Sequence, residues 1–191
     1  MSAKLLNPKG MRRVTIFLQI FFANIVLLFV LIAVHEVGHW SMGIVAGIPV
    51  SQMKIRLFSF PQQVALRDGD RWASVSNYDR YFALLTRYVP SRGGQFLYVV
   101  GGFLFETCFL VALSLALAKM GYWLLAIVAP GLSLSMFLVY VFLMDLPQSK
   151  RIQRPWGDTT ILYSLAPAAG VAVAVIMVVA RVILVAAAWP E

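Results

Sequence analysis

The chain has 191 residues and a net charge of +8, and it is 61% hydrophobic with only 13% charged residues. Soluble domains carry roughly twice that share of charged residues, so an ordinary soluble domain is excluded. The basic residues lie in loops beside apolar stretches, where anionic lipid headgroups rather than nucleic acid are the expected partners.

Long apolar stretches account for most of the chain. Each contains at most one charged residue, and each is longer than the about 20 residues that a helix needs to cross a bilayer. We therefore expect a single membrane-embedded domain over 1–191, an all-α polytopic membrane protein with about four transmembrane helices in the lipid bilayer. The stretches are 14–50, 93–118, 120–144 and 159–190.

A basic tail over residues 1–13 precedes the first stretch. The apolar run that follows is longer than the 7–15 residues of a signal peptide, and no small-residue cleavage site follows it, so we interpret it as an uncleaved anchor. A helix is expected over 14–47. It would be roughly 50 Å long, so it must tilt or project beyond the bilayer.

The segment 48–92 is more polar than its neighbours. Apolar residues alternate with others from Met53 to Phe58, which favours a strand, and Asp68-Gly69 is suited to a tight hairpin turn. Aromatic residues with basic neighbours then favour a short helix at the membrane surface, which Asn77 can cap. We expect a small membrane-associated β-hairpin and an interfacial helix; the alternative is an ordinary loop.

Two further helices are expected over 93–118 and 122–144, and their connection is so short that they must be antiparallel neighbours. A polar segment follows over 145–158. The last apolar stretch, 159–190, should be a broken helix, because Pro167 interrupts the hydrogen-bond ladder.

The motif His35-Glu36-Val37-Gly38-His39 lies within the first apolar stretch and contains both histidines of the chain. Residues four apart lie on one side of a helix, so the two imidazoles can share a metal ion. Glu36 is placed to hold a water molecule and take its proton. Burying these groups in an apolar helix is costly unless they are satisfied, so the motif predicts a zinc-peptidase site.

Catalytic zinc sites usually have three protein ligands, and the two histidines leave one to be found. Three acids lie near the expected membrane depth. Asp158 begins the last apolar stretch, Asp145 ends the third span, and Glu106 follows the Gly101-Gly102 pair, whose small residues permit close helix approach. The residues alone leave all three candidates open, and Glu106 is equally well explained as an interhelical glutamate.

The chain resembles the site-2 protease family of intramembrane zinc metalloproteases, as a compact and divergent member. In that family HExxH is followed by a membrane-associated β-hairpin, an AGPxxN-like motif and an NxxPxxxLDG-like segment. HEVGH matches fully, and Gly101–Glu106 lines up with AGPxxN, although Phe103 replaces the proline and Glu106 the asparagine. The segments 144–147 and 156–159 resemble the NxxP and LDG portions, with an expanded spacer.

The resemblance implies that His35, His39 and Asp158 bind Zn²⁺ and that Glu36 is the general base. It implies a zinc metalloendopeptidase that hydrolyses peptide bonds in or next to the transmembrane segment of a membrane protein. Its partners would be a membrane-protein or peptide substrate and a regulatory membrane protein, in the bacterial cytoplasmic (inner) membrane. The alternatives are a catalytically inactive protease-like subunit or assembly factor, and a metallopeptidase of another class with Glu106 as the third ligand.

Basic residues also bear on orientation and on the last helix. The loops 48–92 and 145–158 hold more of them than the opposite side, which favours a cytosolic location for these loops, although the dense N-terminal tail alone favours the reverse. Arg181 is expected to extend its side chain to the interface near Trp189.

Overall fold

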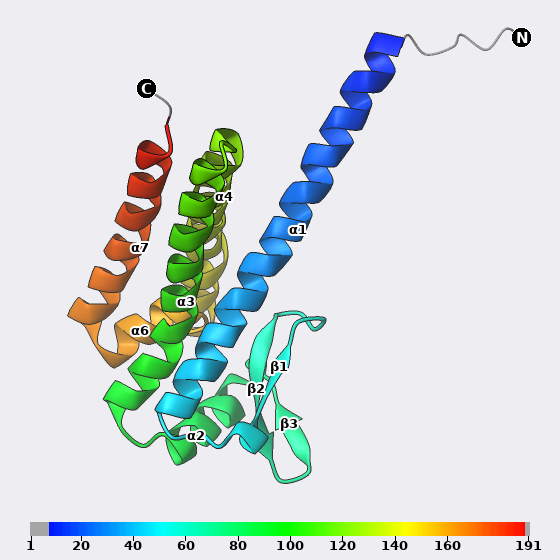
Figure 1. Cartoon of the computed structure of the whole chain (residues 1–191). Helices are drawn as coiled ribbons and strands as arrows, with labels where there is room; N and C mark the ends of the chain where they lie inside the picture. The colour runs from blue at the N-terminus through cyan, green and yellow to red at the C-terminus, as the bar shows by residue number, and fades with distance from the viewer. Residues whose placement is uncertain (1–7, 190–191) are drawn as a thin grey trace, which may run out of the picture.

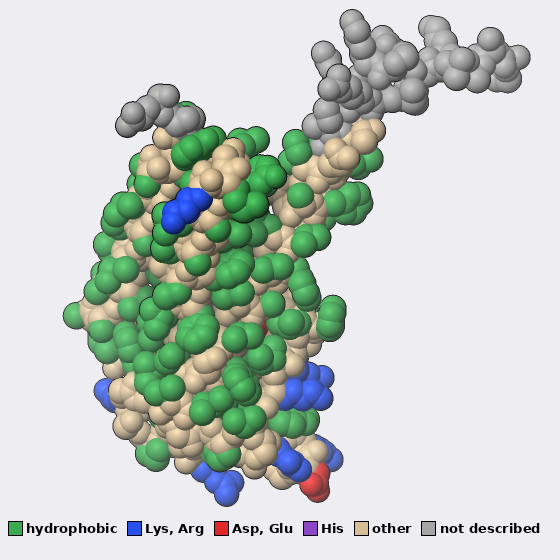
Figure 2. Space-filling view, viewed as in Figure 1, with side chains coloured by type: hydrophobic (Ala, Val, Ile, Leu, Met, Phe, Trp, Pro, Cys, Tyr) green, Lys and Arg blue, Asp and Glu red, His purple; other side chains and the backbone are tan. Residues whose placement is uncertain are grey.

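The computed structural model describes residues 8–189 of the chain. Within that range, four helical segments are long and apolar enough to cross a membrane. This confirms the expected fold, a polytopic α-helical integral membrane protein with a small sheet. Apolar side chains cover most of the face seen in Figure 2, and most of its Lys and Arg side chains gather at the end that carries the sheet. The spans are Phe17–Val45, Arg92–Lys119, Trp123–Ile152 and Pro167–Ala187.

Helix α1 (Pro8–Val45) is the longest element and carries the HEVGH motif. It begins within the expected basic tail, of which residues 1–7 lie outside the described part of the chain. Its C-terminal half packs along α3 (Arg92–Lys119), whereas its N-terminal half stands apart from the other helices (Figure 1). Exposed Phe17, Phe21 and Phe22 in that half are suited to contact with lipid.

The polar segment after α1 folds into a short 3₁₀ turn (Val50–Gln52) and an antiparallel sheet of order β1-β2-β3. The hairpin expected at Asp68-Gly69 is present, because Gly69 adopts the positive φ of 60° that the turn requires. The alternation beginning at Met53 also forms a strand, so the element has three strands rather than two. Their bounds are β1 (Met53–Arg56), β2 (Gln63–Asp68) and β3 (Arg71–Ala73).

Helix α2 (Tyr78–Tyr88) lies where the interfacial helix was expected. Its buried residues Tyr81, Leu84 and Leu85 join the hydrophobic core that includes Val64 and Leu66 of β2. Asn77 precedes the helix, but its side chain makes no capping hydrogen bond. The sheet and α2 therefore form one small unit, placed against the C-terminal half of α1 (Figure 1).

The third span differs from the expected helix over 122–144. Helix α4 (Trp123–Val139) continues through a π-helical turn, η2 (Tyr140–Asp145), into α5 (Leu146–Ile152), so half of the expected polar segment 145–158 is helical. The wider π-helical turn was not visible in the apolar pattern. Turns of this kind are frequent at functional sites. This one brings Tyr140 and Asp145 next to the backbone of Gly157 and Asp158, where the helix after α5 begins.

The last apolar stretch is broken at Pro167, as expected. Helix α6 (Asp158–Leu165) ends just before it, and α7 (Pro167–Ala187) starts with the proline at its first position, where the missing N–H costs nothing. Residues 190–191 of this stretch lie outside the described part of the chain. Helix α6 packs against α3 and α7, and this places its first residue, Asp158, in the interior of the bundle.

Candidate metal centre

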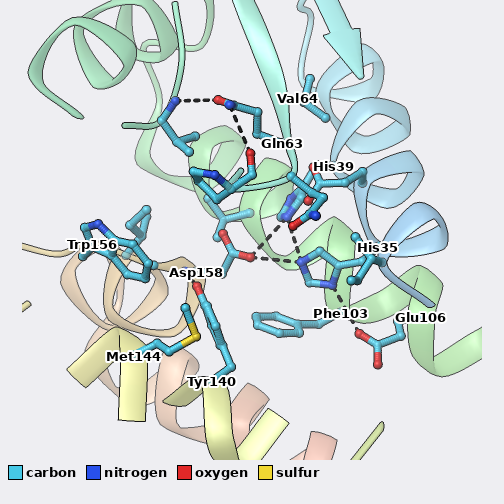
Figure 3. A pocket seen from close by; sticks show the side chains of 18 of the residues that line it. His35, His39, Gln63, Val64, Phe103, Glu106, Tyr140, Met144, Trp156 and Asp158 are labelled. Atoms are coloured by element: carbon cyan, nitrogen blue, oxygen red, sulfur yellow. Dashed lines mark hydrogen bonds and ion pairs between the residues drawn. The ribbon is translucent and has the colours of Figure 1, made fainter. Parts of the chain in front are cut away.

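Three potential ligand atoms converge between α1 and the start of α6. The Nε2 atoms of His35 and His39 lie 3.0 Å apart, and Asp158 Oδ2 lies 3.0 Å from the first and 3.3 Å from the second. Figure 3 shows the two imidazoles and the carboxylate pointing toward one another. In the part of the chain that the structure describes, these are the residues grouped closely enough to hold a metal ion.

The triangle of ligand atoms is slightly smaller than that of a tetrahedral zinc site. Ligand atoms about 2.0–2.1 Å from a central zinc ion lie about 3.3–3.4 Å apart at tetrahedral angles. The observed separations of 3.0–3.3 Å are only slightly shorter than that spacing. A small outward movement of the three side chains would therefore accommodate the ion.

The other nitrogen of His39 determines what its Nε2 atom can do. His39 Nδ1 lies 3.0 Å from the backbone carbonyl oxygen of Tyr98, which can only accept a hydrogen bond. Nδ1 therefore carries the proton, and in the neutral ring the lone pair of Nε2 faces the site. Histidines that bind metals are usually held in this way by a carbonyl or carboxylate.

His35 is oriented in the same way by a side chain. Its Nδ1 atom lies 3.3 Å from Glu106 Oε2. When both rings are neutral and both Nδ1 atoms carry the proton, the two Nε2 lone pairs and a carboxylate oxygen point at one another within hydrogen-bond distance. These three electron-rich atoms repel one another, and a cation bound between them would remove that repulsion.

Gly102 of α3 provides the space beside the two rings. A Cβ atom at this position would lie 2.6 Å from His35 Nε2 and 2.7 Å from His39 Nε2, closer than real Cβ atoms approach. Any larger residue would press on the two ring nitrogens that point toward the site. The Gly101-Gly102 pair thus serves both the close helix packing expected from the sequence and the open space at the centre.

Asp145 anchors the start of α6. Its carboxylate is fully buried and accepts hydrogen bonds from the backbone N–H groups of Gly157, at 3.0 Å, and Thr160, at 3.1 Å. The Tyr140 hydroxyl lies 3.0 Å from the backbone N–H of Asp158 and accepts its hydrogen bond. The π-helical turn thus fixes the backbone on both sides of the Asp158 carboxylate, a contribution that the sequence did not reveal.

The charge of Asp158 is favoured by its neighbours. Burial alone would raise the pKa of this carboxyl group, but His39 and His35, when protonated, more than offset burial and hold the pKa well below its usual value. A cation bound between the three ligand atoms would supply the same positive charge in place of those protons. Asp145, the second candidate ligand, points toward the backbone of α6 and not toward the histidines.

The third candidate, Glu106, contacts the opposite nitrogen of His35 from the one that Asp158 contacts. Its Oε1 atom accepts hydrogen bonds from Ser133 of α4, at 2.5 Å, and Arg181 of α7, at 2.9 Å. The interpretation of Glu106 as an interhelical residue therefore agrees with the structure. The expectation that Arg181 extends to the membrane interface is wrong. Its side chain is only 1% exposed, turns into the bundle and pairs with the Glu106 carboxylate.

The histidines open onto a cavity of about 600 Å³. Glu36, only 7% exposed, lines this cavity together with Val64 of β2. The Val64 carbonyl in turn accepts a hydrogen bond from the Tyr81 hydroxyl, at 2.9 Å. Burial raises the pKa of Tyr81 above its ordinary value, so this hydroxyl stays protonated. The sheet and α2 thus form one wall of the cavity.

Comparisons of the chain with models of protein families, with curated proteins and with solved structures give no match. The site combines three converging ligand atoms, a buried glutamate beside them and a cavity that reaches them.

Proposed function

We propose that the protein is an intramembrane zinc metalloprotease of the site-2 protease type, which hydrolyses peptide bonds in or next to the transmembrane segment of another membrane protein. The observation that supports this most strongly is the convergence of His35, His39 and Asp158 from opposite ends of the chain. Glu36 lies on α1 with the two histidines and lines the same cavity as all three residues. Two imidazoles and one carboxylate form a ligand set found in zinc peptidases.

Each residue has a distinct role in this proposal. His35, His39 and Asp158 would hold Zn²⁺. The bound ion would lower the pKa of a water molecule toward 7 and polarise the scissile carbonyl as a Lewis acid. Glu36 accepts the proton of the attacking water and passes it to the leaving amine. Glu36 is buried and lines the cavity that the two histidines also line, so its carboxylate is on the side of α1 where this water would lie.

The cavity suits an unwound peptide segment. An intact helix hides its amides in hydrogen bonds, so a substrate must be extended before it can be cut. Gln63 and Val64 of β2 line the cavity, so an extended chain bound there would lie against the sheet. Apolar residues such as Phe103 and Met144 line other parts of it and suit the side chains of a membrane segment.

The bacterial cytoplasmic membrane is the location that we propose. The apolar spans and the basic loops beside them support residence in a bilayer whose anionic headgroups face a cytosol. A membrane partner that controls substrate access is part of the same proposal. Capture of such a partner by the full chain in native membranes would test it.

The Glu36→Gln variant tests the proposed activity. Full-length protein in liposomes would be incubated with detergent-extracted membrane proteins, and new peptide termini would be mapped by mass spectrometry. We expect wild-type protein to generate new termini and Glu36→Gln to lose about 10²–10⁴-fold in rate while retaining zinc, because it keeps the ligands and removes the base. Asp79→Asn, at an exposed position in α2, is the matched control and should cleave normally.

Two results would contradict the proposal. Cleavage by Glu36→Gln at the wild-type rate would remove the role of Glu36. Zinc binding by the wild type without any new termini would favour the inactive membrane subunit instead.

A further inference from the structure

An ion pair lies inside the helix bundle, beneath the candidate metal centre. Arg181 of α7 donates from Nη2 to Glu106 Oε1 at 2.9 Å and from Nε to Ser133 Oγ at 2.7 Å. Its Nη1 atom donates to the Met177 carbonyl oxygen at 3.0 Å. The Arg181 side chain is only 1% exposed, and each of its three guanidinium nitrogens thus has a hydrogen-bond acceptor.

The Glu106 carboxylate divides its two oxygens between different partners. Oε1 accepts from Ser133 and Arg181, which leaves Oε2 to face His35 Nδ1 at 3.3 Å. The network thereby joins α1, α3, α4 and α7 through one carboxylate. Figure 3 shows Glu106 on the side of the His35 ring that lies away from Asp158.

The charges of this region balance in two separate groups. A divalent cation would be neutralised by the carboxylates of Asp158 and Glu36, and Glu106 is neutralised by Arg181. Buried charges in an apolar bundle are costly unless they are paired, so Arg181 allows Glu106 to remain an ionised acceptor there. His39 needs no such pair, because the Tyr98 backbone carbonyl holds its Nδ1 atom.

We propose that Glu106, held by Arg181 and Ser133, is a positioning residue for the metal ligand His35. Glu106 keeps the proton of His35 on Nδ1, so that the Nε2 lone pair faces the metal, and it makes the ring a stronger donor. The proposal rests on the proposed metal site and adds the residues that prepare one of its ligands. It also gives a role to the pairing of Glu106 with Arg181, the single charged residues of the expected spans 93–118 and 159–190.

Two double variants separate the acceptor from the buried charge. Glu106→Gln with Arg181→Met keeps a carbonyl oxygen for His35, whereas Glu106→Leu with Arg181→Met removes it. Neither leaves an unpaired buried charge, and Gln and Leu have similar sizes, so packing is matched. The affinity of the purified full chain for Zn²⁺ would be measured in detergent by competition with a chromophoric chelator.

We expect the leucine double variant to bind Zn²⁺ about 10–100-fold more weakly than the glutamine double variant, the range seen when an orienting partner of a metal ligand is lost. Ser114→Ala is the control, because Ser114 is buried in α3 and has no hydrogen-bond partner among the described residues. It should bind zinc as the wild type does.

The outcomes distinguish this inference from the proposed function. If the wild type binds no Zn²⁺, the metal site and this inference both fail. If the wild type binds Zn²⁺ and the two double variants differ by less than about tenfold, the role of Glu106 is overturned and the metal site stands.

Should the leucine variant not fold, NMR of the Co²⁺-loaded protein provides the second test. The shifted Nδ1–H signal of His35 should move in the glutamine double variant, and an unchanged signal would overturn the proposal.

Discussion

Gly38 and Gly101 bring the backbones of α1 and α3 into direct contact beside the converging histidines. A Cβ atom on Gly38 would lie 2.3 Å from the carbonyl oxygen of Gly101, and one on Gly101 would lie 2.6 Å from the carbonyl oxygen of Gly38. No side chain fits between helices at this separation. The close approach places the next residue, Gly102, against the two imidazoles, so the metal centre depends on three glycines as well as on its ligands.

Gly102→Ala should weaken zinc binding, because its Cβ atom would collide with the Nε2 atoms of both histidines. Overpacking of this kind costs about 1–3 kcal/mol, which corresponds to a loss of about 5- to 150-fold in zinc affinity. Gly131→Ala in α4 is the matched control, since a Cβ there meets nothing within 4 Å. Chelator competition measures both variants, and equal affinities for Gly102→Ala and the control would contradict the proposed site.

Asp145→Ala should destabilise the start of α6 and misplace Asp158. The substitution leaves the backbone N–H groups of Gly157 and Thr160 without their buried acceptor, at about 1–3 kcal/mol for each group. Thermal unfolding and zinc affinity should therefore both decrease. Asp79→Ala, which removes an exposed ion pair with Arg154, should change stability by only about 0–1 kcal/mol. Wild-type zinc affinity in Asp145→Ala would show that Asp158 needs no such anchor.

The sheet side of the protein should face the cytosol, since more basic residues lie there than at the opposite end. In a Cys108→Ala background, Asp70→Cys marks the β2–β3 turn and Lys119→Cys marks the other end of the bundle. A membrane-impermeant maleimide should label intact cells at position 119 and should reach position 70 only after permeabilisation. The reverse pattern would place the sheet outside the cytosol.

The sequence predicted the features that depend on local periodicity. Helical phase alone indicated that His35 and His39 share a face, and Pro167 marked the break in the last helix. The turn at Asp68-Gly69 was predicted because its chemistry is local. These features follow from neighbours in the chain, so no knowledge of the tertiary packing was needed.

The contacts that complete the site join distant segments and were not all predictable. The choice of Asp158 came from a motif resemblance, whereas its support by Tyr140 and Asp145 required a π-helical turn that an apolar run conceals. Glu106 and Arg181 are the single charged residues of two expected spans, and that complementarity was a usable signal for their pairing. The Tyr98 carbonyl that orients His39 left no signal, because every residue carries the same backbone group.

Zinc content of the purified full chain tests the central claim most directly. After dialysis against metal-free buffer, elemental analysis should find about one zinc ion per wild-type chain, and Asp158→Ala and His39→Ala should each retain only a small fraction of that amount. Asp79→Ala should retain the wild-type content. A wild-type protein without bound metal, or an Asp158→Ala variant that holds as much zinc as the wild type, would contradict a metal centre built from His35, His39 and Asp158.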